Sequence, residues 1–203
     1  MKQYKNTPLV VEDLFDKETH DVIVQYLNDY VPMLPLLEDV GIPEESQRFK
    51  RRYAVDLPFF SIIHEQLTEY ACDIFGVEVK PSYSFLSMYE DGGQCPLHLD
   101  RPQCRYTIDY LIRQDSAEPW PINIGPQMTD EERDSTTLKR PISKEDIASV
   151  IDSTDWTTCM LKPNDATCYS GTNAWHYRPT RSVGTADLVF FHFVPKDFNG
   201  PLN

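Results

Sequence analysis

The chain has 203 residues, a formal net charge of −13, a hydrophobic content of 40% and a charged content of 25%. This length and composition are typical of one globular domain, residues 1–203, with a sizeable core. The acidic charge would repel a phosphate backbone or an anionic membrane surface, so neither nucleic acid nor a membrane is an expected partner. No apolar run approaches the ~20 residues of a transmembrane helix. The first residues also lack a signal-peptide pattern, so we expect a cytoplasmic protein.

The first third of the chain, residues 1–76, predicts a helical support region. A short apolar strand at 9–11 precedes a helix that Asp13 or Asp16 could cap and that runs to about Tyr30. Pro58 fits the first turn of a second helix, and Gly76 fits its end. The apolar stripe of that second helix has helical spacing and comprises Phe60, Ile63, Leu67, Ala71 and Ile74.

The remainder of the chain predicts short strands with little helix between them. Strand signals fall at 82–89, 105–112, 120–124, 157–161, 166–169, 175–178 and 187–194. Such spacing indicates an antiparallel sandwich or barrel at 77–198, so the fold class is mainly β with N-terminal helices. An acidic insertion at 126–156, with a short helix expected at 144–151, is either a lid or a solvated decoration.

Five cysteines occur without any CxxC spacing, at positions 72, 95, 104, 159 and 168. An odd count without such spacing indicates neither a disulfide framework nor a zinc ribbon. We expect reduced thiols that mostly act as small buried hydrophobes. Cys95 lies close in sequence to His98 and is the exception that could bring a sulfur near a metal.

The pair His98-Leu99-Asp100 carries the strongest chemical signal. Strand side chains alternate, so a His and a carboxylate two residues apart share one face. His176, from a distant strand, can complete a set of two histidines and one carboxylate. This set occupies one face of an octahedral metal and is typical of non-haem Fe(II) oxygenases, because it leaves positions open for cosubstrate and O2.

Longer runs around these residues resemble the iron- and 2-oxoglutarate-dependent dioxygenases, in particular the prolyl-hydroxylase-like members. Residues 88–100, MYEDGGQCPLHLD, resemble the family's strand, turn and HxD segment. Residues 163–171, PNDATCYSG, resemble the turn and strand before the distal histidine, which lies here in GTNAWHYR at 171–178. The resemblance implies a double-stranded β-helix, also called a jelly roll, with the metal inside the barrel.

The resemblance also implies the cofactors and their ligands. Fe(II) would be held by His98, Asp100 and His176, with 2-oxoglutarate and O2 as cosubstrates. Tyr89 and Tyr110 would reach the cosubstrate through their hydroxyls, although either could instead be an aromatic core residue.

One position departs from the family pattern. The family usually carries Arg or Lys on the last strand to bind the far carboxylate of 2-oxoglutarate, and the matching residue here is Ala186. Arg178 is the best substitute, because it lies two residues after His176 and therefore on the same strand face. Its structural alternative is an ion pair with Asp109 or Asp187. His192 shares the register of Ala186 and is either a pocket residue or a core histidine.

Three functions are compatible with these residues. The first is a 2-oxoglutarate-dependent oxygenase that hydroxylates a C–H bond of a small molecule, amino acid or peptide side chain, with release of succinate and CO2. The second is an Fe(II) oxygenase of the same fold that does not use 2-oxoglutarate. The third is a non-catalytic jelly-roll binding module. The sequence does not specify the substrate, the oligomeric state or the choice among hydroxylation, desaturation and cyclisation. The acidic net charge favours a cationic or neutral substrate.

Overall fold

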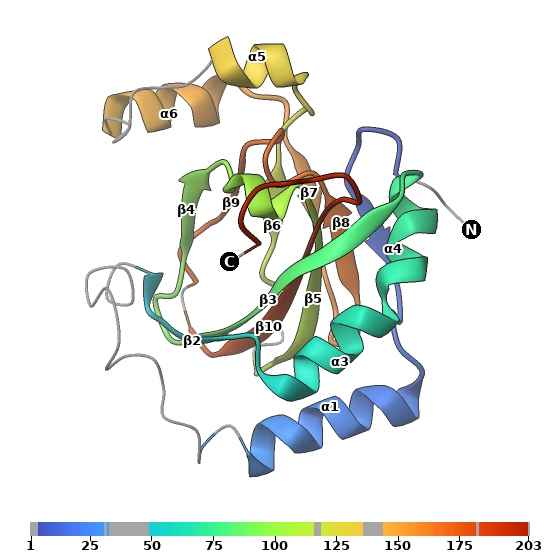
Figure 1. The fold of residues 1–203 in the computed structure, drawn as a ribbon. Coiled ribbons are helices and arrows are strands. Elements are labelled where there is room, and N and C mark those ends of the chain that lie inside the picture. Colours follow the sequence, from blue (N-terminus) through green and yellow to red (C-terminus); the bar gives the residue numbers. More distant parts are fainter. Residues whose placement is uncertain are drawn as a thin grey trace.

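A computed structural model describes residues 4–30, 32, 49–115, 119–135, 144–181 and 183–202. Two antiparallel sheets face each other and form the body of the molecule (Figure 1). The larger sheet has six strands in the order β1-β8-β5-β10-β3-β2, and the smaller has four in the order β4-β9-β6-β7. Their order confirms the two-sheet, jelly-roll architecture expected from the strand pattern.

The six-stranded sheet is built around its two longest strands. Its members are β1 (Leu9–Val11), β2 (Arg51–Val55), β3 (Val79–Tyr89), β5 (Tyr106–Gln114), β8 (Ala166–Tyr169) and β10 (Ala186–Pro195). β10 lies between β3 and β5 and pairs with both. Side chains alternate along each strand, so one face meets the helices and the other faces the smaller sheet.

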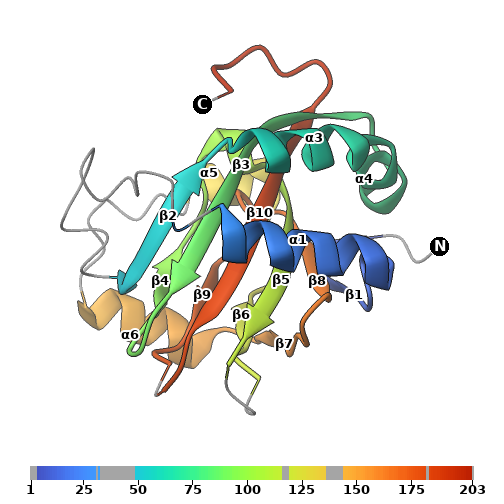
Figure 2. The ribbon, with the colours of Figure 1, turned by 90° about the horizontal axis from the view of Figure 1, so that it is seen from below.

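Within the described part of the chain, three helices cover the outer face of the six-stranded sheet (Figure 2). They are α1 (Lys17–Asp29), α3 (Pro58–Gln66) and α4 (Thr68–Phe75). Asp16 caps α1 by accepting a hydrogen bond from the Thr19 amide, which satisfies one of the free N–H groups of the first turn. Gly76 ends α4 in the left-handed conformation, at φ 69°, that glycine adopts without strain.

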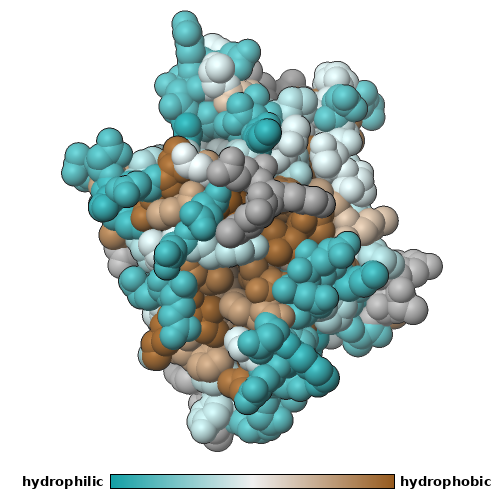
Figure 3. Space-filling view, turned by 90° about the vertical axis from the view of Figure 1, so that its right-hand side faces the viewer, coloured by the Kyte–Doolittle hydropathy of each residue, from teal (hydrophilic) through white to brown (hydrophobic). Residues whose placement is uncertain are grey.

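The helix predicted from Pro58 to Gly76 is two helices that meet at Leu67. The backbone of Leu67 has ψ of −7°, outside ideal helical values, although its amide still bonds the Ile63 carbonyl. The predicted apolar stripe is nevertheless buried along both helices, because the hydrogen-bond ladder and the direction of the stripe continue across the junction. Figure 3 shows apolar side chains between polar ones on the right-hand side of Figure 1.

The smaller sheet consists of short strands joined by long connections. Its members are β4 (Cys95–His98), β6 (Ile122–Ile124), β7 (Thr157–Cys159) and β9 (His176–Arg178). The 126–156 segment contributes two helices, α5 (Asp130–Ser135) and α6 (Lys144–Ser153). Both lie on the side of the molecule away from α1 and α3 (Figure 1). Residues 136–143 of the insertion lie outside the described residues.

Among the described elements, the strand β2 and the helix α5 escaped prediction from the sequence. β2 follows a proline-rich stretch, and its sequence RRYAV gives a weak strand signal because it begins with two adjacent arginines and has no regular apolar–polar alternation. α5 is a six-residue polar helix with no buried side chain, so it has no apolar stripe to detect. Within the described residues, no helix is long and apolar enough to cross a membrane.

Candidate metal centre

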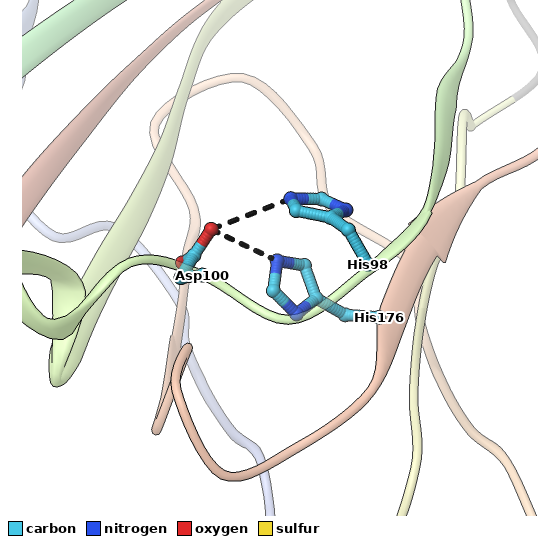
Figure 4. Close-up of side chains that lie close together, drawn as sticks. All are labelled: His98, Asp100 and His176. Carbon is cyan, nitrogen blue, oxygen red and sulfur yellow. Dashed lines mark ion pairs between the residues drawn. The ribbon is translucent and has the colours of Figure 1, made fainter. Parts of the chain in front are cut away.

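His98, Asp100 and His176 converge between the two sheets (Figure 4). β4 and β9 pair antiparallel, and His98 lies directly opposite His176 in their register. β4 ends at His98, so Asp100 lies just beyond the strand rather than on it. The Asp100 amide donates to the Gly171 carbonyl at 2.9 Å, and this bond fixes the loop that carries the carboxylate.

The three donor groups face one another at short distance. Oδ1 of Asp100 lies 3.3 Å from Nε2 of His98 and 3.7 Å from Nε2 of His176. Nδ1 of His98 bonds the Pro96 carbonyl at 2.7 Å, and Nδ1 of His176 bonds the Ala174 carbonyl at 2.9 Å. Main-chain carbonyls only accept, so both Nδ1 atoms carry a proton, and the Nε2 atoms are the ring nitrogens that face Asp100.

Burial and mutual attraction set the charges of the three groups. Burial would raise the pKa of Asp100, but His176 and His98 hold that pKa well below its ordinary value. Burial lowers the pKa of His176 to about 4, with His98 adding to the effect. Burial acts against a charge on His98, yet Cys95 and Asp100 raise its pKa well above the ordinary value. Asp100 is therefore ionised and His176 neutral, which are the ligand forms that a metal needs, whereas His98 would release its Nε2 proton when a metal binds.

These residues fit a divalent metal ion. All three donor atoms lie within 4.8 Å of one another, and each histidine is oriented by a carbonyl acceptor behind it. Two imidazoles and one carboxylate form the donor set used by non-haem iron oxygenases. Gly171 leaves the space for the carboxylate, because a Cβ there would overlap Asp100 Oδ2 and lie 2.7 Å from the Cys104 carbonyl oxygen.

A cavity of about 920 Å³ opens beside the three residues. Its volume suits a cosubstrate together with a small organic molecule. Side chains from both sheets line the cavity, and Ile147 of α6 also reaches its wall. One side chain of the insertion therefore lines the cavity, and its role as a lid or as a solvated decoration stays a prediction.

Arg178 lies in the cavity wall but is paired. Its guanidinium donates to Oδ2 of Asp109 at 2.6 Å and to the Trp120 carbonyl at 3.0 Å, and its carbon lies 5.1 Å from the Trp120 ring centre. Arg178 is 3% exposed and Asp109 is fully buried. The ion pair considered as the structural alternative thus exists, while the arginine still faces the cavity.

Tyr89 lies at the same end of the barrel as Arg178. Its ring packs against Trp120, and its hydroxyl accepts a hydrogen bond from Arg51 at 3.0 Å. Arg51 also lines the cavity and lies over the Phe49 and Phe85 rings. The sequence interpretation missed Arg51 because it missed β2, whose alternation would have indicated that Arg51 and Tyr53 share a face.

Tyr110 lies on the opposite side of the six-stranded sheet. Its ring packs against Phe15, and its hydroxyl contacts His20 Nδ1 at 2.6 Å and Asn164 at 3.2 Å. Neighbouring Asp109 faces the barrel interior, so strand alternation directs Tyr110 toward α1. The structure therefore does not bring Tyr110 to the candidate metal ligands, contrary to the expectation of a cosubstrate contact.

His192 combines the two roles considered for it. It lines the cavity, and its Nδ1 lies 3.1 Å from the Thr107 hydroxyl. His192, Cys104 and Asp100 form a second group whose ligand atoms lie within 4.8 Å of one another. The Cys104 thiol lies 2.9 Å from the Tyr83 hydroxyl.

The five cysteines are free thiols. Cys95 Sγ is 4.0 Å from His98 Nδ1, so this sulfur lies behind the His98 ring rather than on the side that faces the other metal ligands.

Comparison with solved structures identifies the fold. No family model and no curated protein sequence matches the chain. Among solved structures, the non-haem α-ketoglutarate-dependent carbocyclase SnoK from nogalamycin biosynthesis has a TM-score of 0.70 at 10% identity, covering 94% of this chain and 80% of SnoK. EctD from S. alaskensis with bound Fe has a TM-score of 0.66 at 12% identity, covering 97% and 76%.

A third similar structure was determined with ligands in place. HygX from Streptomyces hygroscopicus, with nickel, 2-oxoglutarate and hygromycin B bound, has a TM-score of 0.64 at 14% identity, covering 94% of this chain and 84% of HygX. The chain thus has the jelly-roll fold of iron- and 2-oxoglutarate-dependent oxygenases, and it carries a candidate His-Asp-His metal site inside that fold.

Proposed function

We propose that the protein is an Fe(II)- and 2-oxoglutarate-dependent oxygenase that acts on a small organic molecule. The observation that carries this proposal is the convergence of His98, Asp100 and His176 at the edge of a 920 Å³ cavity within this fold. Iron with 2-oxoglutarate and O2 supplies oxidation of a C–H bond, with succinate and CO2 as coproducts. Similar proteins with other reactions, an epimerase and a carbocyclase, leave the class of oxidation open.

The proposed function assigns different roles to the residues around the cavity. His98, Asp100 and His176 would hold the metal through Nε2, a carboxylate oxygen and Nε2. Arg178 would bind the far carboxylate of 2-oxoglutarate. Arg51 lines the same cavity and donates a hydrogen bond to the Tyr89 hydroxyl, which lies behind the lining. Planar guanidinium groups suit this role because they bind carboxylates through two parallel hydrogen bonds. The aromatic walls would exclude water from the reacting centre.

The proposed anchor, Arg178, has a buried acidic partner. Asp109 neutralises Arg178, and its second oxygen, Oδ1, is buried without a hydrogen-bond partner. Burial raises the pKa of Asp109 although Arg178 opposes that shift.

Formation of succinate from 2-oxoglutarate tests the proposed function without a known substrate. The protein with Fe(II) in air should convert 2-oxoglutarate slowly to succinate, and Asp100→Ala should reduce this rate to the background of free iron. Asp73→Ala, which removes an exposed carboxylate from α4, is the matched control and should retain the rate. Equal rates in wild type and Asp100→Ala would refute the metal site.

A second candidate rests on Ala186 and the Arg178–Asp109 pair. Ala186 is fully buried and provides no charge for a dicarboxylate, and the nearest substitute is already paired. An Fe(II) oxygenase that does not use 2-oxoglutarate would also fit these two features. Oxygen uptake by the iron-loaded protein with a substrate, but without 2-oxoglutarate, would favour this candidate.

A further inference from the structure

The end of the cavity opposite Arg178 carries a second arginine beside the metal ligands. Arg101 directly follows Asp100 and lines the cavity. Its guanidinium donates to the Tyr83 hydroxyl at 2.8 Å and lies 5.3 Å from the Tyr83 ring centre. Tyr89 packs on Trp120, which also contacts Arg178, so Tyr89 marks the Arg178 end of the cavity. Tyr83 and Tyr89 are six residues apart on β3, which corresponds to ~20 Å along the strand. Arg101 and Arg178 therefore belong to different ends of the barrel.

Arg101 has hydrogen-bonding capacity to spare. A guanidinium has five N–H donors, and the phenol of Tyr83 engages the Nη2 end. Among the described residues, Arg101 forms no ion pair with a carboxylate, whereas Arg178 is paired with Asp109. Tyr83 is buried and its oxygen also meets Cys104 Sγ, so it is a fixed support that orients the arginine.

The charge of the cavity is opposite in sign to that of the molecule. Among the described residues that line it, Asp100 is the only carboxylate, and Asp100 is a candidate metal ligand. Three arginines line the same space, namely Arg51, Arg101 and Arg178. A bound divalent ion would add further positive charge. The net charge of −13 favours a cationic or neutral substrate, but the local field in the cavity attracts an anion.

A wall of aromatic rings lines the same cavity as these arginines. Tyr53, Phe85 and Phe190 come from the neighbouring strands β2, β3 and β10 and all line the cavity. The Tyr53 and Phe85 rings stack with centres 5.1 Å apart at 17°, and Phe85 and Phe190 are 6.2 Å apart. All three are only half-buried, so part of each ring is exposed to the cavity.

We propose that the oxidised substrate is a small organic carboxylate with a flat, apolar body. This proposal rests on the proposed function and specifies its substrate class. The carboxylate binds the free N–H groups of Arg101, and the apolar body lies against Tyr53, Phe85 and Phe190. Arg101 adjoins Asp100 in sequence, so an anion held there places the attached carbon skeleton next to the metal site.

Binding of paired aromatic probes tests the proposal. The protein is loaded with Zn(II), which does not react with O2, and with saturating 2-oxoglutarate; the affinities of 3-phenylpropanoate and 3-phenylpropanamide are then measured by ligand-observed NMR. The carboxylate should bind at least about tenfold more tightly than the amide, because a charged hydrogen bond is lost. Arg101→Gln should remove that preference, and Arg52→Gln, on the other face of β2, should retain it.

Separate readouts distinguish the two proposals. The Fe(II)–2-oxoglutarate charge-transfer band should form normally in Arg101→Gln, which shows an intact metal and cosubstrate site. Three results would overturn the substrate class while the band still forms: the amide binds as well as the carboxylate, Arg101→Gln keeps the preference, or neither probe binds. The oxygenase proposal would stand in each of these cases. In a separate titration that starts without 2-oxoglutarate, complete displacement of the carboxylate probe by added 2-oxoglutarate would place the probe at the Arg178 end and would also overturn the proposal. Absence of the band in wild type refutes the oxygenase proposal itself.

Discussion

At the scale of single residues, Gly171 is the position at which the carboxylate ligand is most sensitive to substitution. Gly171→Ala should weaken Fe(II) binding by about 10- to 100-fold, because its Cβ would push Asp100 away from the two histidines. Gly125→Ala is a milder control, since its Cβ meets a Thr154 methyl group at 3.1 Å. Metal titration of the two variants measures the effect, and equal affinities would show that Asp100 does not depend on the space left by Gly171.

The buried pair Arg178–Asp109 should behave as a unit. Arg178→Met should destabilise the fold by about 3–5 kcal/mol, because it leaves a buried carboxyl group without its partner. The double variant Arg178→Met/Asp109→Leu should be more stable than that single variant, since it removes both charges. Urea unfolding of the single and double variants measures the coupling. Additive losses in the double variant would show that the two side chains act independently.

Strand alternation explains which residue roles were predictable. The His98-x-Asp100 spacing and a distant histidine suffice to propose the metal ligands, and the register of β4 with β9 brings them together. The same alternation, applied to neighbouring Asp109 and Tyr110, would have placed them on opposite faces. Pairing of Arg178 with Asp109 depends on two strands in different sheets, and no local pattern specifies that contact.

At the scale of elements, α3 should make folding stability depend on pH through His64. This side chain is buried against the Phe191 and Phe193 rings of β10, and burial lowers its pKa to about 3. Below the ordinary histidine pKa of 6.5, His64 binds a proton in the unfolded chain but stays neutral in the folded state. Stability should therefore fall as the pH falls from 6.5 toward 3, by up to about 1.4 kcal/mol per pH unit.

His64→Leu should remove this contribution and flatten the pH dependence. Urea unfolding at several pH values between 4.5 and 7 measures the slope in the variant and in wild type. His20→Leu is a useful comparison, because His20 is only partly buried on α1. An unchanged slope in His64→Leu would mean that other groups account for the acid sensitivity.

The short helix α5 is held against the loop that leads to His176. Oδ1 of Asp130 accepts hydrogen bonds from Arg105 at 2.6 Å, Asn173 at 2.8 Å and Arg133 at 3.2 Å. Asp130→Ala should release α5, because no buried apolar side chain holds it. Hydrogen exchange should then accelerate over 126–135 while Fe(II) binding is retained, and Glu131→Ala should have no such effect. Unchanged exchange in Asp130→Ala would show that other contacts anchor the helix.

Predictability of the elements followed the strength of their apolar patterns. The termini of α1 and α4 are marked by Asp16 and Gly76, and the long strands by β-branched and aromatic runs. The polar helix α5 and the short strand β2 lack such patterns. Packing in three dimensions, rather than local sequence, determines where these elements lie.

At the scale of the whole molecule, the charge that lines the cavity differs in sign from the net charge of the chain. The chain carries 32 acidic and 19 basic residues, yet the described lining of the cavity includes three arginines and one carboxylate. Total charge therefore describes the outer surface and long-range repulsion, whereas the field at the site depends on which side chains face inward. The acidic composition consequently does not identify the substrate.

The most direct test of the central claim is an anaerobic titration with Fe(II) followed by 2-oxoglutarate. We predict a weak visible charge-transfer band in wild type, its loss in His176→Ala, and its formation only at higher 2-oxoglutarate concentration in Arg178→Lys, which keeps the charge without the planar fork. Iron binding without a band in wild type would contradict the use of 2-oxoglutarate. Failure to bind iron would contradict the metal centre itself.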